Sequence, residues 1–291
     1  MNDFSAQWLA LREPYDQRAR SAALERQLIE ALAARREIPL TVIDLGGGTG
    51  ANLRHLAPRL AGAQHWRIVE NDATLLEAVP DAMAAWARRA GHGFREAAGG
   101  WQVDGMNFSA RISLDRCDLA QAVPELALHG AFMVTASALL DLVSSAWLDV
   151  LLRRCAAVRA CVLFAMSYDG AIAWTPAHAD DAIVRDAFNA HQRRDKGFGA
   201  ALGPCATAMA RRSLASLGYE VAVAASDWSI GGGDAEIVRA LLSGWSDAAI
   251  EARPHARATI QRWREYRVEA IAGERAAVVV GHRDLLGLPP L

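Results

Sequence analysis

The feature that most constrains the fold is a glycine-rich turn that separates a short apolar run from a helical segment. The run LTVIDL at 40–45 is apolar almost throughout, which is typical of a strand buried on both faces of a parallel sheet. The turn GGGTG follows at 46–50, a helix is predicted over 52–60, and a second strand over 66–69. This order predicts the first unit of a parallel α/β sheet.

The alternation of strands and helices continues through residue 168 and predicts a doubly wound, mostly parallel sheet. We expect further helices at 21–36, 75–90, 145–158 and 206–217. We expect further strands at 110–114, 131–137, 160–167, 219–226 and 276–282. A hairpin is predicted over 101–108 because Asp104-Gly105 suits a tight turn, and Pro80 is expected to break its helix.

Two segments interrupt the alternation and are expected to cap the carboxyl edge of the sheet. They are 169–205 and 229–272, and the second carries helical patterns at 235–244 and 257–272. Ligands of open α/β sheets bind outside the carboxyl ends of the strands, so insertions there form pocket walls. We therefore divide the chain into a helical cover, a cofactor-binding α/β core, a cap insertion and the end of the core, at 1–39, 40–168, 169–205 and 206–291.

Composition excludes several classes of protein. The chain of 291 residues is 52% hydrophobic and has a net charge of −2, so it can bury a core and has no bulk attraction for nucleic acid or an anionic membrane. No apolar run reaches the length of a membrane span, and the amino-terminal sequence lacks a secretory pattern. The four cysteines form no C-x-x-C pair, which favours a reducing compartment. We expect a cytoplasmic protein.

The glycine turn is suited to hold a nucleotide cofactor. Gly46, Gly48 and Gly50 permit a tight turn that a ligand can approach closely, and the following helix presents unpaired N–H groups at its start. Glu70 lies at the end of the second strand, where a carboxylate can accept hydrogen bonds from both ribose hydroxyls of an adenosine. The turn and the acid together predict a cofactor site.

The residue that favours one cofactor over another is Asp44, two positions before the first glycine. The pattern Gly46-x-Gly48-x-x-Ala51 also fits a dinucleotide fingerprint, so NAD(P) is an alternative. A pyrophosphate would be repelled by the Asp44 carboxylate, whereas a cofactor with a sulfonium and an ammonium group tolerates it. No Tyr-x-x-x-Lys pair supports an oxidoreductase, and S-adenosylmethionine is the favoured cofactor.

Three motifs in order, IDLGGGTGANLRHLAP, RIVEND and RCDLA, make residues 20–285 resemble the class I S-adenosylmethionine-dependent methyltransferases. The resemblance implies a Rossmann-like sheet of seven strands whose last two form an antiparallel hairpin, although the long insertion between those strands departs from the family pattern. It implies the following cofactor-binding residues: Asp44, Gly46, Gly47, Gly48, Gly50, Asn52, Glu70, Asn71, Asp118, Leu119 and Thr135.

Individual contacts follow from the same resemblance. Asp44 and the glycines would lie along the methionine part and the ribose, Glu70 on the ribose hydroxyls, and Asp118 on the adenine amino group; the alternative for Asp118 is an ordinary acid at a strand end. The amino-terminal stretch resembles a helical cover over the cofactor. Its Arg12, Tyr15 and Arg20 could reach the methionine carboxylate, or could belong to a solvated, charge-paired helix.

Methyl transfer from a sulfonium needs alignment of the reactants more than it needs a catalytic group, so a base is required only if the acceptor loses a proton. The candidate catalytic residues are Asp141, His191 and Tyr168. Asp141 lies among leucines, where its pKa could be raised, or it could start a helix. A helix would place His191 and Asp195 at i and i+4 as a base and its orienting acid, although a solvated histidine is the alternative.

Candidate acceptor contacts are Trp174, Trp228 and Ser137, although either tryptophan could belong to the core. The histidines show no spacing typical of metal ligands, so we expect no metal. The leading hypothesis is a methyltransferase that acts on a small-molecule acceptor, without a nucleic-acid or membrane partner. The alternatives are an NAD(P)-dependent oxidoreductase, a methyltransferase acting on a macromolecule, and a non-catalytic binding protein; the acceptor atom and the oligomeric state stay open.

Overall fold

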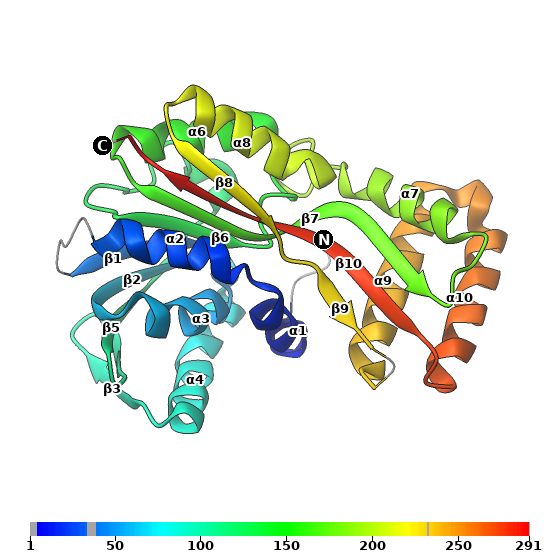
Figure 1. Cartoon of the computed structure of the whole chain (residues 1–291), viewed down its shortest axis with the longest axis horizontal. Coiled ribbons are helices and arrows are strands. Elements are labelled where there is room, and N and C mark those ends of the chain that lie inside the picture. Colours follow the sequence, from blue (N-terminus) through cyan, green and yellow to red (C-terminus); the bar gives the residue numbers. More distant parts are fainter. Residues whose placement is uncertain (1–4, 34–38, 232, 291) are drawn as a thin grey trace.

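The computed structural model describes residues 5–33, 39–231 and 233–290, and it has an α/β architecture (Figure 1). Within these residues ten strands form one sheet in the order β3-β4-β5-β2-β1-β6-β7-β10-β8, and β9 pairs with β10. The strands are β1 Leu40–Leu45, β2 Gly62–Glu70, β3 Gly93–Ala97, β4 Gly100–Asp104, β5 Phe108–Arg116, β6 Met133–Ser137, β7 Cys161–Thr175, β8 Glu220–Ala225, β9 Trp228–Ile230 and β10 Ala277–Leu288.

Five neighbouring strands, β5-β2-β1-β6-β7, are parallel, and β10 runs antiparallel between β7 and β8. Strand order proceeds outward from β1 in both directions, toward β2 on one side and toward β6 on the other. This reversal is the topological switch point at which doubly wound sheets bind ligands. The carboxyl end of β1, with the glycine turn, is therefore where a site is expected.

Helices cover both faces of the sheet. One face packs against α2, α3 and α4, and the opposite face packs against α5, α6 and α8 (Figure 1). The helices are α1 Ala6–Ala19, α2 Ala22–Ala33, α3 Ala51–Leu60, α4 Ala73–Ala90, α5 Leu119–Ala122, α6 Ser145–Ala157, α7 Asp181–Gln192, α8 Ala206–Ser216, α9 Ala235–Ala252 and α10 Arg257–Ala272. Of the helices described, none has the length and apolar character that crossing a membrane requires.

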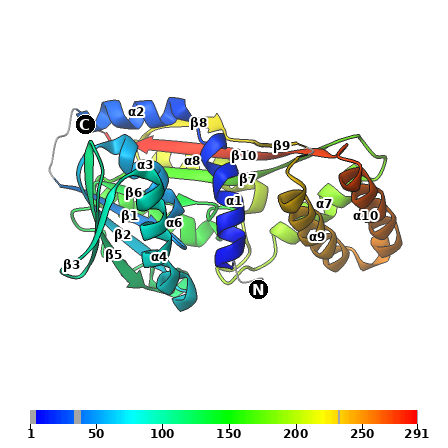
Figure 2. The same ribbon diagram turned by 90° about the horizontal axis from the view of Figure 1, so that it is seen from below.

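Strands β7 and β10 extend beyond the sheet and carry a second core. Their distal halves pair from Tyr168–His282 to Thr175–Ala277, and α7, α9 and α10 pack on them with β9. We call this unit the helical lobe; in Figure 2 its three helices lie side by side beyond the end of the sheet. Three indole rings, of Trp174, Trp245 and Trp263, meet edge to face in its core.

A buried ion pair lies beside these rings. The Arg267 side chain is fully buried, and its guanidinium lies 4.7 Å from the ring centre of Trp174. It donates to the Asp181 carboxylate and, at 2.6 Å, to the Pro176 carbonyl. Asp181 also accepts from the Trp263 indole at 2.7 Å. The lobe is thus a packed unit, because this buried cation has both a charge partner and aromatic neighbours.

The structure corrects several expectations about the elements. The sheet has ten strands among the described residues instead of seven, because the short strands β3 and β4 extend one side of it and β9 pairs with β10. The expected domain boundary after residue 168 falls within β7. The part of β10 that pairs with β8 is Arg283–Leu288, not the segment at 276–282. The extension of β7 and β10 and their register arise from pairing between strands far apart in the chain, which local sequence patterns do not encode, whereas β3 and β4 form a local hairpin.

Pro80 does not break α4, which is continuous from Ala73 to Ala90. A proline inside a helix removes one backbone hydrogen bond. Here Val79 and Met83, on either side of the proline, are both fully buried against the sheet, and this packing holds the helix together across the missing bond.

We predict that Trp263→Ala lowers the free energy of unfolding by about 3–5 kcal/mol, because it opens a cavity beside the buried Arg267–Asp181 pair. Urea unfolding measures the loss. Trp101→Ala is the matched control, since Trp101 lies on β4, next to the edge strand β3, and is only partly buried. Equal losses in the two variants would contradict a tightly packed helical lobe.

Candidate functional site

The glycine turn lies between β1 and α3, and its backbone requires glycine. Gly46, Gly48 and Gly50 have positive φ angles of 60°, 53° and 82°. A Cβ atom on Gly50 would lie 2.2 Å from the Met83 Cε atom, and one on Gly48 would lie 2.8 Å from the Leu9 Cδ1 atom of α1. Both the conformation and the space therefore exclude larger residues, and the turn lies directly beneath α1.

Glu70 ends β2 and lies against this turn. Its Oε2 atom accepts the Gly48 N–H at 3.0 Å, and its Oε1 atom accepts the N–H groups of Asn71 at 2.8 Å and Asp72 at 3.1 Å. Three backbone donors thus hold the carboxylate at the carboxyl edge of the sheet. The predicted proximity of turn and acid is present in the structure.

Asp118 is at the N-cap of α5. Its carboxylate accepts the Ala120 N–H and the Gln121 side-chain amide, each at 3.0 Å. This is the role of an ordinary acid at the end of a strand, and contact with an adenine amino group stays a prediction. The adjacent Leu119 is buried, and its carbonyl accepts the Trp147 indole N–H at 2.6 Å.

The Asp44 carboxylate is completely buried at the end of β1. Its Oδ1 atom accepts the Asn52 side-chain amide at 2.9 Å, and its Oδ2 atom has no hydrogen-bond partner among the described residues. Burial raises the pKa of Asp44 to about 7, against the lowering effects of the Asn52 hydrogen bond and the nearby Arg20 cation. The same Asn52 amide donates to the Thr135 hydroxyl at 3.0 Å. Asn52 and Thr135 thus position Asp44.

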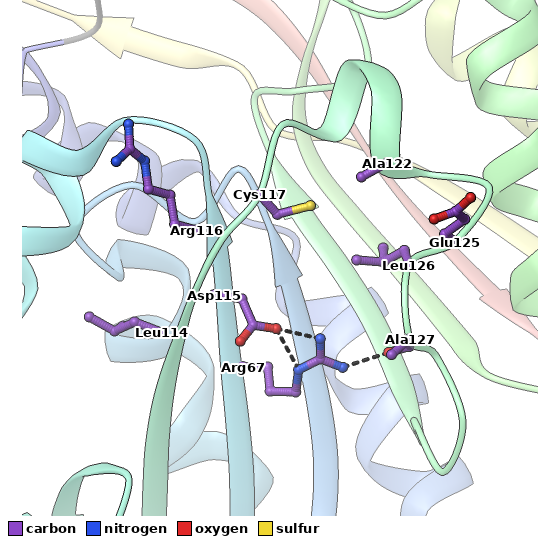
Figure 3. Close-up of a pocket in the computed structure, with 9 residues that line it drawn as sticks. All are labelled: Arg67, Leu114, Asp115, Arg116, Cys117, Ala122, Glu125, Leu126 and Ala127. Carbon is purple, nitrogen blue, oxygen red and sulfur yellow. Dashed lines mark hydrogen bonds and ion pairs between the residues drawn. The ribbon is translucent and has the colours of Figure 1, made fainter.

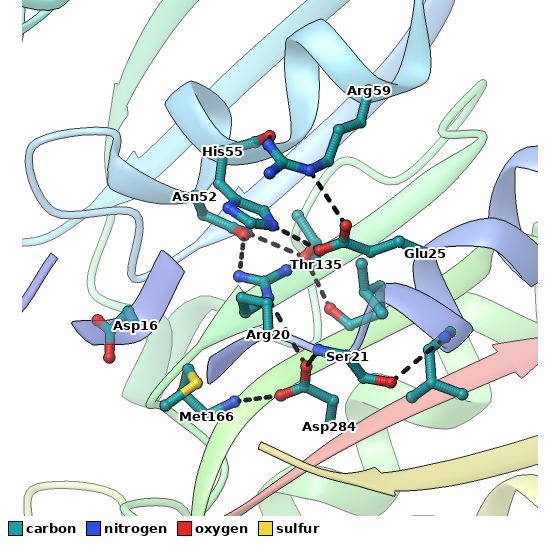
Figure 4. A network of polar contacts seen from close by, with 12 residues as sticks. Asp16, Arg20, Ser21, Glu25, Asn52, His55, Arg59, Thr135, Met166 and Asp284 are labelled. Atoms are coloured by element: carbon teal, nitrogen blue, oxygen red, sulfur yellow. Dashed lines mark hydrogen bonds and ion pairs between the residues drawn. The ribbon is translucent and has the colours of Figure 1, made fainter. Parts of the chain in front are cut away.

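Arg20, in the joint between α1 and α2, is the second buried group with unused hydrogen-bonding atoms. Its Nη1 atom donates to the Asn52 side-chain oxygen at 2.9 Å (Figure 4). Its Nε and Nη2 atoms have no hydrogen-bond partner in the part of the chain described, and the Asp284 Oδ2 atom is 3.8 Å from Nε. Asn52 therefore bridges the Oδ1 atom of Asp44 and the Nη1 atom of Arg20. The Oδ2 atom of Asp44 and the Nε and Nη2 atoms of Arg20 stay unsatisfied among the described residues.

A small cavity adjoins Arg20 under α1. Its volume is about 20 Å³, which admits a single water-sized group. The lining residues come from α1, its joint with α2, α3 and the end of β6: Glu13, Asp16, Gln17, Arg20, Ala51, Asn52, His55 and Ser137. Ser137 thus faces the space beside Arg20, where the sequence placed it as an acceptor contact.

Helix α1 lies across the carboxyl edge of the sheet, between the sheet and the helical lobe (Figure 2). None of its described side chains is fully buried, but one face of α1, which includes Trp8 and Leu11, packs against the core of the helical lobe. Polar contacts hold the helix as well. These contacts reach three different elements: Glu13 binds Arg54 at 2.6 Å, Tyr15 donates to Asp234 at 2.8 Å, and Asp16 accepts from the Trp228 indole at 3.0 Å.

Asp141 lies in the segment between β6 and α6, beside the loop that follows α7. It is 7% exposed, and its Oδ1 atom has no hydrogen-bond partner among the described residues. Burial raises its pKa to about 6, while the Arg12 and Lys196 cations act in the opposite direction. The alternative that Asp141 starts a helix is wrong, because Ser144 is the N-cap of α6 and its hydroxyl accepts the Trp147 N–H at 3.3 Å.

Both ring nitrogens of His191 have partners. Its Nε2 atom lies 3.2 Å from a Glu251 carboxylate oxygen, and its Nδ1 atom lies 3.2 Å from the Lys196 ammonium. The expected pair with Asp195 is wrong: α7 ends at Gln192, and the Asp195 carboxylate accepts backbone N–H groups of its own loop. Sequence spacing missed Lys196, whose only signal was that it is the one lysine in the chain.

The remaining candidates lie in or near the lobe core. The Tyr168 hydroxyl donates to the Asn189 side chain at 2.7 Å, and burial raises its pKa. Trp174 is buried among the lobe helices. Trp228 is also buried, and its ring lies 5.1 Å from the Arg12 guanidinium of α1. Trp228 thus contacts α1, the helix that lies over the glycine turn, whereas Trp174 forms part of the lobe core.

A larger hollow of about 330 Å³ lies beside the end of β5 (Figure 3). Arg67 forms an ion pair with Asp115 there and donates to the Ala127 carbonyl at 2.5 Å. None of its lining residues has a buried polar atom without a partner. Across residues 5–33, 39–231 and 233–290, no group of three or more His, Cys, Asp or Glu side chains could hold a metal ion. The hollow thus offers no built site.

Comparison with known proteins gives a similarity to solved structures alone. No family model and no curated protein matches the chain. Three of the similar structures are a methyltransferase from Geobacter sulfurreducens with S-adenosyl-L-homocysteine (12% identity, 100% of both chains, TM-score 0.45), a methyltransferase from Thiobacillus denitrificans with the same ligand (14%, 98% of both chains, 0.42) and the YcgJ protein from Bacillus subtilis (12%, 93% of this chain and 100% of that one, 0.47). Identities this low leave the chemistry to be inferred from the residues themselves.

We predict a pH-dependent effect of Asp44→Asn on stability. The pKa of Asp44 is raised from 3.8 to about 7, so between these values the folded chain keeps a proton that the unfolded chain has released. This group's contribution to stability therefore falls as pH rises through that window and is level above it. The Asp44→Asn variant lacks this loss, so its stability relative to the wild type should rise by about 1 kcal/mol per pH unit. Urea unfolding at pH 5, 6, 7 and 8 measures the difference, and a constant difference would contradict the raised pKa.

Proposed function

We propose that the chain is an S-adenosylmethionine-dependent methyltransferase that transfers a methyl group to a small-molecule acceptor. One observation carries the proposal: beside the glycine turn, the buried Asp44 carboxylate and the buried Arg20 guanidinium both have unused hydrogen-bonding atoms. The two groups match the ammonium and the carboxylate of an amino acid. The methionine part of the cofactor is the ligand that supplies both charges at one end of an adenosine.

The glycine turn and Glu70 support the same cofactor. Gly46 to Gly50 would let the backbone approach the ribose and the methionine chain closely, and Glu70 would accept the ribose hydroxyls. Asn71, Asp118 and Leu119 lie at the ends of the neighbouring strands, where the adenine would be placed. Asn52 would act through Asp44, to which its amide donates, and Thr135 would act through Asn52.

The NAD(P) alternative is less well supported. A dinucleotide has no ammonium group for the unpartnered Asp44 oxygen, and its pyrophosphate would lie near that carboxylate. A macromolecular acceptor is disfavoured as well, because α1 and the helical lobe flank the carboxyl edge of the sheet (Figure 2). We propose a location in the cytoplasm, since no disulfide joins the cysteines of the described chain.

When bound, S-adenosylmethionine supplies a methyl group that is already activated by a sulfonium. The residues of this chain would then align the acceptor and exclude water. Asp141 is suited to accept the proton that an N–H or O–H acceptor loses as its lone pair takes the methyl group, because the Oδ1 atom is unpartnered and the pKa lies near the working pH. Ser137 would contact the acceptor at the end of β6, and Trp228 would border it beside α1. Trp174 and Tyr168, in the lobe core, would act only by packing behind the residues that contact the acceptor.

We predict that Arg20→Met weakens S-adenosylhomocysteine binding about 10- to 100-fold and leaves the affinity for 5′-methylthioadenosine unchanged. The variant loses charge-assisted hydrogen bonds to a carboxylate that only the first ligand carries. Titration calorimetry measures both affinities. Arg26→Met, at an exposed position on α2, is the matched control and should bind both ligands normally.

Two results would contradict the cofactor assignment. Equal weakening of both ligands by Arg20→Met would place Arg20 away from the amino-acid part. A thermal shift of the wild-type chain with NAD or NADP, and none with S-adenosylmethionine or S-adenosylhomocysteine, would favour the oxidoreductase alternative. A ligand at one hundred times its dissociation constant stabilises a protein by about 2.7 kcal/mol, so the shift is measurable.

We predict that Asp141→Asn lowers turnover by a factor of about 10² to 10⁴, because the amide cannot accept the acceptor proton. The affinity for S-adenosylhomocysteine should stay within about twofold of the wild type, since the Asp141 side chain makes no hydrogen bond to the glycine turn or to Glu70 in the described chain. Release of S-adenosylhomocysteine in the presence of an acceptor found by screening measures turnover. Asp186→Asn, on an exposed position of α7, controls for the loss of one carboxylate. Unchanged turnover in the Asp141 variant would exclude it as the base.

A further inference from the structure

The loop after α7 is attached directly to the segment that carries Asp141. The Gly203 N–H donates to the Asp141 carbonyl at 3.0 Å, and the Leu202 N–H donates to the Val143 carbonyl at 2.8 Å. A bridge between Ser144 and Ala201 continues this pairing. The loop therefore keeps a constant position relative to the buried carboxylate.

The same loop is tightened at its outer end by Asp195. The Asp195 carboxylate accepts the N–H of Gly197 at 2.7 Å and that of Gly199 at 3.0 Å, and both glycines have positive φ angles, of 99° and 85°. Lys196 lies between the carboxylate and these two donors in the chain. Its backbone is therefore held in a closed turn, and its side chain starts from a defined place.

The Lys196 ammonium is oriented without being neutralised. It donates to the Nδ1 atom of His191 at 3.2 Å, while the Nε2 atom of His191 faces Glu251. Glu251 is shared with Arg194, and in the described part of the chain no carboxylate lies within ion-pair distance of Lys196. The partly buried ammonium thus has the His191 ring as its hydrogen-bond partner and no ion-pair partner in the described chain.

The charge of Lys196 also acts on Asp141. Lys196 is close enough to Asp141 to affect its pKa, and so is Arg12. Arg12 is already occupied, because it forms two hydrogen bonds with Asp16, at 2.9 and 3.1 Å. Lys196 is therefore the cation that is available to a ligand at this end of the site.

We propose that Lys196 binds an anionic group of the methyl acceptor, so that the acceptor is an amine or an alcohol that also carries a carboxylate or a phosphate. The inference rests on the proposed function, because it assigns the acceptor end of the same site. Asp141 receives the N–H or O–H of such a molecule through its free oxygen, and Lys196 receives the anion through its free N–H groups. His191 acts as a positioning residue that holds the ammonium.

The test uses the fact that Lys196 is the only lysine in the sequence. The purified full-length chain, with and without saturating S-adenosylhomocysteine, is reductively methylated with formaldehyde and a borane reagent, and the products are quantified by mass spectrometry. Phosphate or malonate replaces chloride at constant ionic strength. An anion at the ammonium favours its protonated form, so we expect at least fivefold slower modification of Lys196. The α-amino group of the same chain is the internal control and should not change.

Variants give an independent readout. In thermal-shift measurements with S-adenosylhomocysteine present, phosphate or malonate should stabilise the wild-type chain and Arg193→Met more than Lys196→Met, which keeps only the general stabilisation that such kosmotropic anions give a folded protein. Arg193 is an exposed cation of the same loop, so it matches the loss of charge. A response to phosphate alone, or to malonate alone, identifies which anion the acceptor carries.

The outcomes separate this inference from the assignment of the cofactor. Calorimetry on the same preparation measures S-adenosylhomocysteine binding. Absent binding contradicts the proposed function, whether or not the anions act. Intact binding with equal modification rates at Lys196 in all three buffers, or equal anion stabilisation of the Lys196→Met chain, overturns the anion site alone.

Discussion

The pairing of β10 with β7 is the constraint on which the rest of the structure depends. Over its length β10 completes the sheet beside β7 and β8 and then carries the helical lobe on its distal half. Asp284, within this strand, accepts the N–H groups of Met166 and of Ser21 at 2.9 Å each. One strand therefore sets the position of the sheet, the lobe and the joint between α1 and α2. The elements that surround the candidate site are therefore positioned by this pairing.

Two places with unsatisfied polar atoms lie along the carboxyl edge of the sheet. Beside the glycine turn, Asp44 and Arg20 form a pair of opposite charge around Asn52. Beside the loop after α7, Asp141 has an unsatisfied Oδ1 atom, and Lys196, whose ammonium contacts His191, is a nearby cation. Buried polar atoms without partners cost free energy, so the unsatisfied atoms at these two places favour the binding of charged ligands. We interpret the first place as the binding site of the cofactor and the second as the binding site of the acceptor.

The local part of the site was predictable because short motifs encode it. The strand LTVIDL, the glycine turn and Glu70 at the end of the next strand lie together as their order predicts, since parallel strands that follow one another end at the same edge. The pairing of His191 with Asp195 was wrong, because helical spacing assumes a helix that in fact ends at Gln192. Contacts to catalytic and acceptor residues stay predictions, since they depend on ligands.

The sequence by itself determined the order of strands and helices, the place of the glycine turn and the buried acid at the end of β1. These depend on periodicity and on backbone conformations that only glycine adopts readily, and both are properties of neighbouring residues. Only the tertiary structure decided that β7 and β10 extend into a lobe, that α1 packs between this lobe and the sheet and that Lys196 lies near Asp141. Each of these joins segments far apart in the chain, and such contacts depend on packing energies that no local pattern contains.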